Sequence, residues 1–486
     1  MLRRLLVLLL LLTPLATVGA PMGFDEARHL LNRTSFAASV EDIESFSKLT
    51  RAQAVDQLLA WTGGKVGTPA PAWINEFESP RKLRGLSEEE RKAFQRRQFE
   101  KGAELRGWWV TEMLTTPSPL SEKMVLFWHN HFVSSLQKVR SASLMYRQNQ
   151  LLRKHAFGYF GDMLHEVSKD PAMVIYLDGA SNRKGQPNEN FAREVMELFT
   201  LGEGNYGEQD VKEAARAFTG WSIDPDSGEF LLRQPAHDGG VKTVLGRSGN
   251  FDGDAVLDIL LSQAQTAEFI VAKMWREFVS PQPEISEVKR IARMFRENRY
   301  NIRIALRAVL TSDAFYAAQN RAALIKSPIE LIVGTLRQFR FETGEVTPFL
   351  IAARQLGQDV FAPPNVKGWP GGEAWINSAT LLARKQFLER LFRAQEMRSP
   401  PPAMARDSGA NNVAGAPAGT EARERFARAV ADIHFDSERW LRQFPAGDPA
   451  LTKVVLAAVP ATVVATTAQG IDRLRELVLD PAYQLK

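Results

Sequence analysis

The sequence contains no cysteine, which limits both its covalent chemistry and its metal chemistry. Disulfides, thiolate metal sites, a cysteine nucleophile and a lipidated N-terminal cysteine are therefore all excluded. The chain is nevertheless long, with 486 residues of which 44% are hydrophobic. This is enough apolar material to fill a sizeable core, so a chain that is disordered throughout is excluded as well.

The sequence also has no long run of one charge. It carries 61 basic and 56 acidic residues, a net excess of only +5. The densest charged stretch, residues 81–101, mixes both signs at helical spacing, which indicates a solvated helix face. We therefore expect no nucleic-acid partner, because nucleic-acid binding proteins concentrate their positive charge.

Several common catalytic motifs are missing. There is no GxSxG, no HExxH, no phosphate-binding loop and no dinucleotide fingerprint, so the usual hydrolase, zinc protease, NTPase and dehydrogenase classes have no support. Asn250, Asp252 and Asp254 resemble the start of a calcium loop, but Ala255 stands where that loop needs glycine and Leu261 where it needs glutamate. A calcium loop is therefore excluded.

The first twenty residues, MLRRLLVLLLLLTPLATVGA, have the layout of a secretory signal peptide. Two arginines precede an apolar run from Leu5 to Leu12, and small residues follow a proline. The apolar run is shorter than the roughly 20 residues that a membrane-spanning helix needs. We expect an exported protein, periplasmic or secreted, with no stable membrane span once the signal is removed.

Strand signals are sparse and helix starts are frequent, which predicts a mainly α fold. Proline follows a capping residue at Ser118-Pro119, Asp170-Pro171 and Ser327-Pro328, as expected for the first turn of a helix. Further helices are predicted from a cap at Asp25 and over 37–61, 87–115, 189–199, 208–219, 328–340 and 376–396. Residues 228–249 alternate around Asp238-Gly239-Gly240 and predict one inserted β-hairpin.

The domain organisation follows from composition. Residues 21–398 form the predicted main helical domain. Residues 399–420 are rich in proline, glycine and alanine and poor in bulky apolar residues, so we predict a disordered insertion there. Residues 421–486 resume the helical pattern and are expected to pack back on the main domain.

The segment from Asp170 to Trp221 is the densest in polar, aromatic and glycine residues. A helix over 189–199 would place Glu189, Asn190, Arg193, Glu194 and Glu197 on one arc and apolar side chains on the other. The arc is either an ion ladder in water or part of a cleft in which Glu194 and Glu197 act as acid and base or bind a cation. The loop before it supplies oxygen ligands for a tentative divalent metal ion, namely Asp178, Asn182 and Asn188.

Histidines and tryptophans provide the other candidate site residues. His129 and His131, two apart on one helix, point in nearly opposite directions and cannot share one metal ion, so each is either a site residue or a buried core histidine. Tryptophans beside polar motifs are typical of sugar sites and also of cores. The remaining candidates for catalysis are His237 and Asp238. Those for substrate binding are Asn190 and Arg193 of the arc, together with Lys242, Trp221, Asn365, Lys367 and Trp369.

An ordered series of motifs over nearly the whole chain resembles one family, the exported bacterial proteins with domain of unknown function 1800. The motifs are HLLNRTSF, FWHNHFVSS, DPAMVIYLDG, PNENFAREVMELFTLGEGNY, DVKEAARAFTGW, HDGGVKTVLG, PPNVKGWPGG and DPAYQLK. The resemblance implies a mostly helical fold and a periplasmic or secreted address, without an established activity. It also implies a partner, because genes of this family often lie beside those of exported proteins similar to alkaline phosphatases and sulfatases.

Three functions are compatible with these observations. The first is an accessory or binding protein that acts on a cell-envelope or extracellular polymer together with a phosphatase-like or sulfatase-like partner. The second is a hydrolase, with or without a metal, that uses Glu194 and Glu197 assisted by a histidine. The third is a structural envelope protein, in which these polar residues would be scattered or face water.

Overall fold

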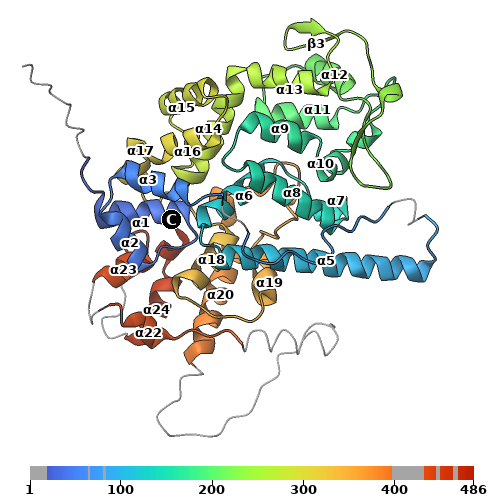
Figure 1. The fold of residues 1–486 in the computed structure, drawn as a ribbon. Coiled ribbons are helices and arrows are strands. Elements are labelled where there is room, and N and C mark those ends of the chain that lie inside the picture. Colours follow the sequence, from blue (N-terminus) through green and yellow to red (C-terminus); the bar gives the residue numbers. More distant parts are fainter. Residues whose placement is uncertain (1–18, 64–65, 80–83, 397–431, 445–448, 463–468) are drawn as a thin grey trace, which may run out of the picture.

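The computed structural model describes residues 19–63, 66–79, 84–396, 432–444, 449–462 and 469–486. Helices make up most of this part of the chain, and two small two-stranded antiparallel sheets complete it (Figure 1). The predicted mainly α class is therefore confirmed. The predicted signal peptide, apart from its last two residues, and the predicted insertion at 399–420 lie outside the described residues.

The elements follow one another along the chain with short connections. The α-helices are α1 (Gly23–Thr34), α2 (Val40–Ser47), α3 (Arg51–Ala60), α5 (Glu88–Thr115), α6 (Pro119–His131), α7 (Leu136–Val139), α8 (Ala142–His155), α9 (Phe160–Ser168), α10 (Pro171–Tyr176), α11 (Asn190–Glu194), α12 (Glu208–Ala217), α13 (Gly253–Ser262), α14 (Ala264–Phe278), α15 (Ile285–Glu297), α16 (Ile302–Leu310), α17 (Asp313–Tyr316), α18 (Pro328–Gln338), α19 (Thr347–Gln355), α20 (Ser378–Glu396), α22 (Ser437–Leu441), α23 (Pro449–Val455) and α24 (Gly470–Leu479). The strands are β1 (Trp221–Ile223), β2 (Phe230–Leu232), β3 (Lys242–Val244) and β4 (Arg247–Gly249).

The proline-initiated helices begin where the sequence predicts. α6, α10 and α18 each carry proline in the first turn, and Ser327 and Glu330 form the predicted capping box of α18. At α6 the Ser118 side chain makes no capping bond, because its hydroxyl lies 2.8 Å from that of Ser121 instead.

The N-terminal helices differ from the prediction. The first helix begins at Gly23, so Asp25 lies within its first turn rather than capping it. The single helix predicted over 37–61 is two helices, α2 and α3, because Thr50 and Gln53 form a capping box that starts a new one.

The inserted β structure consists of two hairpins instead of one. β1 pairs with β2 and β3 pairs with β4. The turn between β3 and β4 lies at Leu245-Gly246, where both residues have positive φ, 47° and 77°. This is the backbone that a tight two-residue hairpin turn needs. Asp238-Gly239-Gly240 precedes β3 and is not the turn, because the Asp238 carboxylate binds Arg216 of α12.

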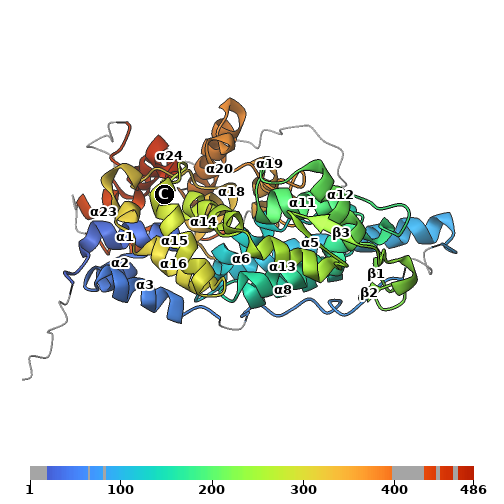
Figure 2. The same ribbon diagram turned by 90° about the horizontal axis from the view of Figure 1, so that it is seen from above.

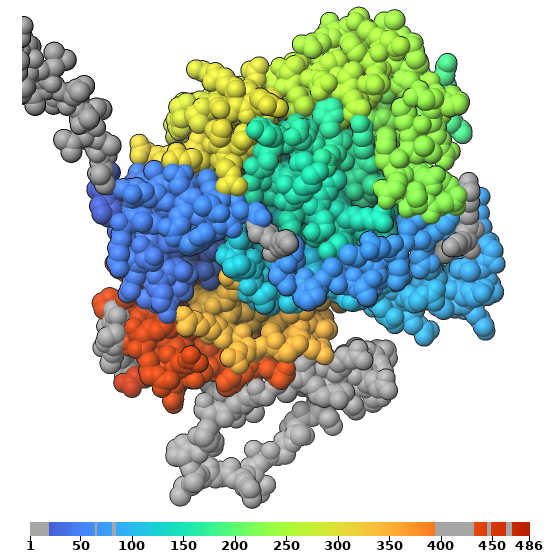
Figure 3. All heavy atoms as spheres, in the orientation of Figure 1, coloured from blue at the N-terminus to red at the C-terminus, as the bar shows by residue number. Residues whose placement is uncertain are grey.

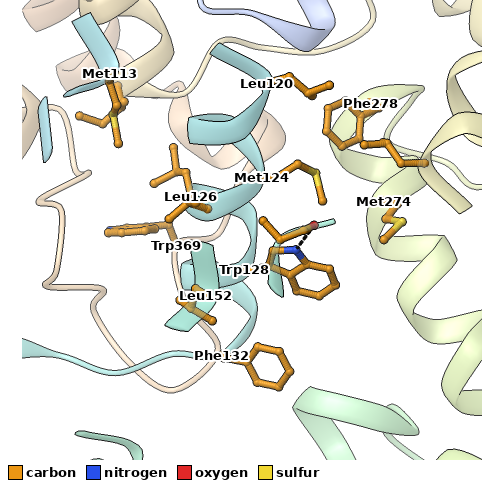
Figure 4. Close-up of a cluster of buried hydrophobic side chains, with 14 of the residues drawn as sticks. Met113, Leu120, Met124, Leu126, Trp128, Phe132, Leu152, Met274, Phe278 and Trp369 are labelled. Atoms are coloured by element: carbon orange, nitrogen blue, oxygen red, sulfur yellow. Dashed lines mark hydrogen bonds between the residues drawn. The ribbon is translucent and has the colours of Figure 1, made fainter. Parts of the chain in front are cut away.

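Helix α6 lies in the middle of the molecule in both ribbon views (Figures 1 and 2). Its side chains join buried residues from far along the chain into one core, which extends from Met22 to Tyr483. Figure 4 shows Leu126 and Trp369 on one side of α6 and Met274 and Phe278 of α14 on the other. Trp128 donates its indole N–H to the carbonyl of Ala156 at 3.1 Å. Both ends of α6 are thus held by core packing.

The N-terminal half of α5 projects beyond the rest of the molecule (Figures 1 and 3). Its side chains from Glu88 to Glu100 are exposed or partly exposed. The interpretation of this charged stretch as a solvated helix face is therefore confirmed for the residues of α5.

No single helix of the described residues is long and apolar enough to cross a membrane. One pair, α13 and α14, meets the length and composition test together, but it is bent by 74° at its junction.

Asp170 at the start of α10 is buried, and its carboxylate accepts hydrogen bonds from the Met173 N–H at 3.2 Å and from Gln148 Nε2 at 2.8 Å. Burial raises the pKa of Asp170 from 3.8 to about 7. Between these two pH values the folded state holds a proton that the unfolded chain releases. The stability of the wild type should therefore rise as the pH falls from 8 to 4.

We expect Asp170→Asn to remove this dependence while keeping a capping side chain. The variant should be more stable than the wild type by about 4 kcal/mol at pH 8, and this advantage should disappear near pH 4. Urea unfolding at both pH values measures the difference. A difference that stays constant with pH would show that Asp170 does not titrate in this range.

Candidate functional site

A cavity of about 390 Å³ opens between the C-terminal half of α6, the end of α14, the start of α18 and the loop at 367–375. We call it the cationic pocket. Its charged and polar lining residues are Lys123, Asn130, His131, Lys273, Arg276, Glu277, Ser327, Glu330, Gln358, Lys367 and Lys486, and its largest apolar surfaces belong to Leu126, Phe127, Trp369 and Trp375.

Glu330 is the centre of a buried ion network in the floor of the pocket. One of its oxygens accepts hydrogen bonds from both Lys123 and Lys486, and the other accepts from the backbone N–H of Ser327 at 2.8 Å. Burial alone would raise the pKa of Glu330, but the two ammonium groups outweigh it and hold this pKa well below its usual range. Lys486 also lies 3.4 Å from Glu277. Both carboxylates of the pocket are therefore engaged by Lys123 and Lys486.

Three further cations line the pocket without such a partner. Within the described part of the chain, no carboxylate lies at ion-pair distance from Lys273, Arg276 or Lys367. Lys273 and Arg276 are three apart on α14 and lie on the same face of the helix. Burial, and then the charge of Arg276, lower the pKa of Lys273 to about 8. The pocket thus holds three cations that form no ion pair with a carboxylate of the described residues.

The hydrogen bonds of His131 define its tautomer. Its Nε2 lies 3.2 Å from the carbonyl oxygen of Phe199, which can only accept, so Nε2 carries the proton. Its Nδ1 is then the acceptor for the Lys273 ammonium at 2.9 Å. Burial and the neighbouring Lys273 hold the pKa of His131 well below its usual value. His131 is therefore a neutral acceptor in the pocket wall.

The Phe199 carbonyl lies in the last turn of its helix, where carbonyl groups have no partner within the helix. The predicted helix over 189–199 is α-helical only from Asn190 to Glu194 and continues as a π-helical turn, η2 (Val195–Thr200). In this turn Leu201 N–H bonds to the carbonyl of Met196, five residues back. π-helical turns recur at functional sites. The carbonyl of Phe199 in this turn bonds to His131, which lines the pocket.

Asn130 attaches the loop at 367–375 to the end of α6. Its amide oxygen accepts from the backbone N–H of Trp369 at 2.7 Å, and its amide nitrogen donates to the Trp369 carbonyl at 3.4 Å. Gly368 has a φ of +83°, and a Cβ on it would lie 2.2 Å from the Asn130 Oδ1. Only glycine allows the two segments to approach this closely. Lys367 and Trp369 are therefore held at the pocket by the Asn130 clamp.

His129 is buried on a different side of α6 from His131. Its ring is surrounded by Trp109, Phe361 and Trp369, with centroid distances of 5.4, 5.4 and 5.6 Å. Burial lowers the pKa of His129 to about 3, and its Nε2 has no partner among the described residues. The two histidines contact different neighbours, as the helix geometry requires, and His129 does not line the pocket.

Glu194 and Glu197 lie on neighbouring positions beside the pocket rather than in its lining. Glu194 is half-buried, and no hydrogen bond to its carboxylate is found within the described residues. Burial, and then the charge of Glu197, raise the pKa of Glu194, while Arg193 and Lys367 oppose this. Glu197 accepts a hydrogen bond from the Tyr206 hydroxyl at 2.7 Å. Lys367 lines the pocket, and its charge also acts on the Glu194 carboxylate.

Most other residues of the predicted polar arc serve internal bonds. Arg193 forms ion pairs with Glu208 of α12 at 2.7 Å and with Glu189 at 3.1 Å. The predicted ion ladder therefore forms between Glu189 and Arg193, and the second partner of Arg193 is Glu208 instead of Glu197. Asn190 donates to the Asp178 carboxylate at 3.1 Å, which Lys138 also binds at 2.8 Å.

The tentative metal ligands have hydrogen-bond partners in and around their own loop. The amide oxygen of Asn182 accepts from the backbone N–H of Asn188, and that of Asn188 accepts from the backbone N–H of Asn190. The Asp178 carboxylate is bonded to Lys138. Among the described residues, no group of three or more histidine, aspartate or glutamate side chains is placed to hold a metal ion. The predicted site consists of one aspartate and two asparagines, and it stays a prediction.

The predicted residues around His237 form a separate structural cluster. The His237 ring bonds to the Thr219 carbonyl at 3.0 Å, and Asp238 binds Arg216 at 2.8 Å. Lys242 is buried and donates to the backbone carbonyls of Asp238 and Gly240. Trp221 packs on Phe191, Phe218 and Phe230, and Asn365 bonds to the backbone N–H of Lys367. The lining of the cationic pocket does not include the predicted residues His237, Asp238, Lys242, Trp221 and Asn365.

Of the residues predicted from the sequence, the pocket therefore collects His131, Lys367 and Trp369. The sequence reasoning missed the residues that give it its charge, namely Lys123, Lys273, Arg276, Glu277, Glu330 and Lys486. One signal was available, since Lys273, Arg276 and Glu277 interrupt the apolar second half of this helix, and Arg276 and Glu277 follow Lys273 by three and four residues.

Comparison with known proteins gives one match. The model of the family described as "Protein of unknown function (DUF1800)" matches residues 29–481. Neither the curated proteins nor the solved structures gave a match.

Proposed function

The chain belongs to the DUF1800 family of proteins of unknown function, and we propose that it is a binding protein whose cationic pocket holds an anionic group of its ligand. The observation that carries this proposal is the charge of the lining. Five cations face two carboxylates, 5 − 2 = +3, and both carboxylates are engaged by Lys123 and Lys486. Lys273, Arg276 and Lys367 remain, and they offer the donors that carboxylate, sulfate and phosphate groups require.

The ligand class follows from the charge of the lining and from the predicted address. Trp369 and Trp375 are only 3% and 6% exposed, so they shape the pocket wall, and the exposed donors of the lining are left to recognise the anionic group. The predicted signal peptide directs the chain out of the cytoplasm. We therefore propose that the ligand is an acidic polymer of the cell envelope or the exterior, such as a sulfated, phosphorylated or uronic acid polysaccharide.

This ligand class also fits the proposed partner, an exported protein similar to alkaline phosphatases or sulfatases and encoded nearby. Such a partner would act on phosphate or sulfate esters, the same kind of anionic group that the pocket would hold. Crosslinking in the native host followed by affinity purification tests the association. The partner should be recovered with the wild type in cells that make the polymer. Recovery of no envelope protein would contradict this part of the proposal.

Ligand binding is tested with oligosaccharides of equal length that carry sulfate, phosphate, carboxylate or no charge. We expect at least one charged series to bind at least ten times more tightly than the neutral one, and its affinity to fall with added salt. Equal binding of the neutral series would exclude recognition of an anion. If no series binds, the structural role becomes the better account.

A second candidate function is hydrolysis at Glu194 and Glu197. It is favoured by the half-buried Glu194 carboxylate, whose raised pKa suits a general acid. Glu194→Gln should lower turnover of a charged oligosaccharide about 100-fold or more, without changing its affinity. An unchanged rate would exclude this mechanism, and metal analysis of the purified protein would test whether an ion assists.

A further inference from the structure

We propose that Lys273 is a nucleophilic amine that forms an imine with the carbonyl group of an anionic ligand held in the cationic pocket. This inference rests on the proposed function, because the same pocket supplies the anion recognition. The ligand class is an aldehyde or ketone that also carries a carboxylate, sulfate or phosphate group. The reducing end of an acidic sugar in its open-chain form belongs to this class.

The geometry around the amine carries the proposal. Lys273 lines the pocket, and among the described residues its ammonium has one hydrogen-bond partner, His131 Nδ1 at 2.9 Å, and lies 5.1 Å from the centre of the Phe269 ring. Because His131 must donate its other nitrogen to Phe199, it can only accept from Lys273. A neutral Lys273 amine would therefore direct one N–H at His131 and keep its lone pair for the cavity.

Neighbouring charge distinguishes Lys273 from the other lysines of the pocket. Lys123 and Lys486 form ion pairs with the Glu330 carboxylate, whereas Lys273 bonds to a neutral histidine and lies near the guanidinium of Arg276. The remaining lysine of the lining, Lys367, is exposed. A lysine desolvated beside another cation is the usual design of an imine-forming amine. With a pKa of about 8, about one amine in ten is neutral at pH 7, against about one in 2,500 for an ordinary lysine.

The step balances without any further reactant. The Lys273 lone pair attacks the carbonyl carbon, a C–N bond forms, and the proton lost from nitrogen is gained by the oxygen to give a carbinolamine. Loss of the hydroxyl together with the remaining proton of this nitrogen releases water and leaves a C=N bond. Arg276 is three residues from Lys273 on α14 and, with Lys367, would bind the anionic group while the carbonyl meets the amine.

Pyridoxal 5′-phosphate is a suitable probe because it combines an aldehyde with a phosphate. The full chain is incubated with it, reduced with borohydride, and mapped by mass spectrometry. We expect Lys273 to be labelled at least tenfold more than exposed Lys289 at pH 7, with a labelling midpoint near pH 8. Pyridoxal, which has no phosphate, should label Lys273 at least tenfold less.

Lys273→Arg keeps the charge and removes the nucleophile. Mass spectrometry should find no adduct at this position in the variant, whereas Lys289→Arg, at an exposed position on α15, should leave the labelling of Lys273 unchanged. If the wild type binds the probe and Lys273 is labelled no more than Lys289, the inference is overturned while the anion site stands. If neither the probe nor the charged oligosaccharides bind, the proposed function fails with it.

Discussion

Replacing Glu330 by glutamine is expected to destabilise the protein by about 3–5 kcal/mol. Glu330 is the shared acceptor of Lys123 and Lys486, and all three side chains are buried. The glutamine would leave the buried Lys123 ammonium without a carboxylate, and would leave Lys486 with only the more distant Glu277 carboxylate at 3.4 Å. The cost is the desolvation of these charges and not the loss of a surface ion pair.

The comparison should be made by urea unfolding against Glu287→Gln, a surface variant on α15. Glu287 pairs with Arg290 three residues away and should cost less than about 1 kcal/mol. Adding Lys123→Met to Glu330→Gln should recover part of the loss, because it removes one of the stranded charges. Equal effects of the Glu330 and Glu287 variants would contradict the network.

The pH dependence of this effect has a definite sign. The pKa of Glu330 is held well below 4.5, so its stabilising contribution is complete above that pH and is lost as the pH falls below it. The difference between wild type and Glu330→Gln should therefore shrink under acidic conditions.

Gly368→Ala is expected to destabilise the fold by about 2–4 kcal/mol and to weaken ligand binding at the pocket. The new Cβ would lie 2.2 Å from the Asn130 Oδ1 and 2.8 Å from the Asn130 carbonyl oxygen. A side chain could turn away, but the backbone oxygen belongs to α6 and cannot. The loop must then detach from the helix, which displaces Lys367 and Trp369.

Gly372→Ala in the same loop is the matched control. Its φ is also positive, +55°, but nothing lies within 4 Å of its added Cβ. It should cost about 1 kcal/mol from backbone strain alone. Thermal and urea unfolding of both variants separate strain from collision. If the two variants were equally destabilised, the Asn130 clamp would not be the reason that residue 368 is glycine.

The fold was largely predictable because its signals are local. Capping boxes and proline at the first helical turn act within four residues, and α5, α10 and α18 begin where these signals place them. The turn at Leu245-Gly246 was missed because leucine rarely adopts positive φ, so Asp238-Gly239 gave the stronger signal. The π-helical turn was missed for a similar reason, since an amphipathic wheel assumes a constant period.

The candidate site was less predictable because its parts come from distant positions. Lys123, Lys273, Glu330 and Lys486 belong to different elements, and only the fold brings their charges together. His131 and Lys367 could be named because they stand in conspicuous motifs. His237 and Asp238 also stand in a conspicuous motif, but in the structure they bond to the Thr219 carbonyl and to Arg216 and so hold the hairpin against α12.

Calorimetric titration of an acidic oligosaccharide into the double variant Arg276→Gln, Lys367→Gln tests the central claim most directly. The control is Lys289→Gln, Arg293→Gln, which removes the same charge from exposed positions on α15. Two charged hydrogen bonds of about 1.5 kcal/mol each correspond to a loss of about 100-fold in affinity for the pocket variant. The control variant should bind like the wild type. Equal affinities for all three proteins would show that the ligand does not bind in the cationic pocket.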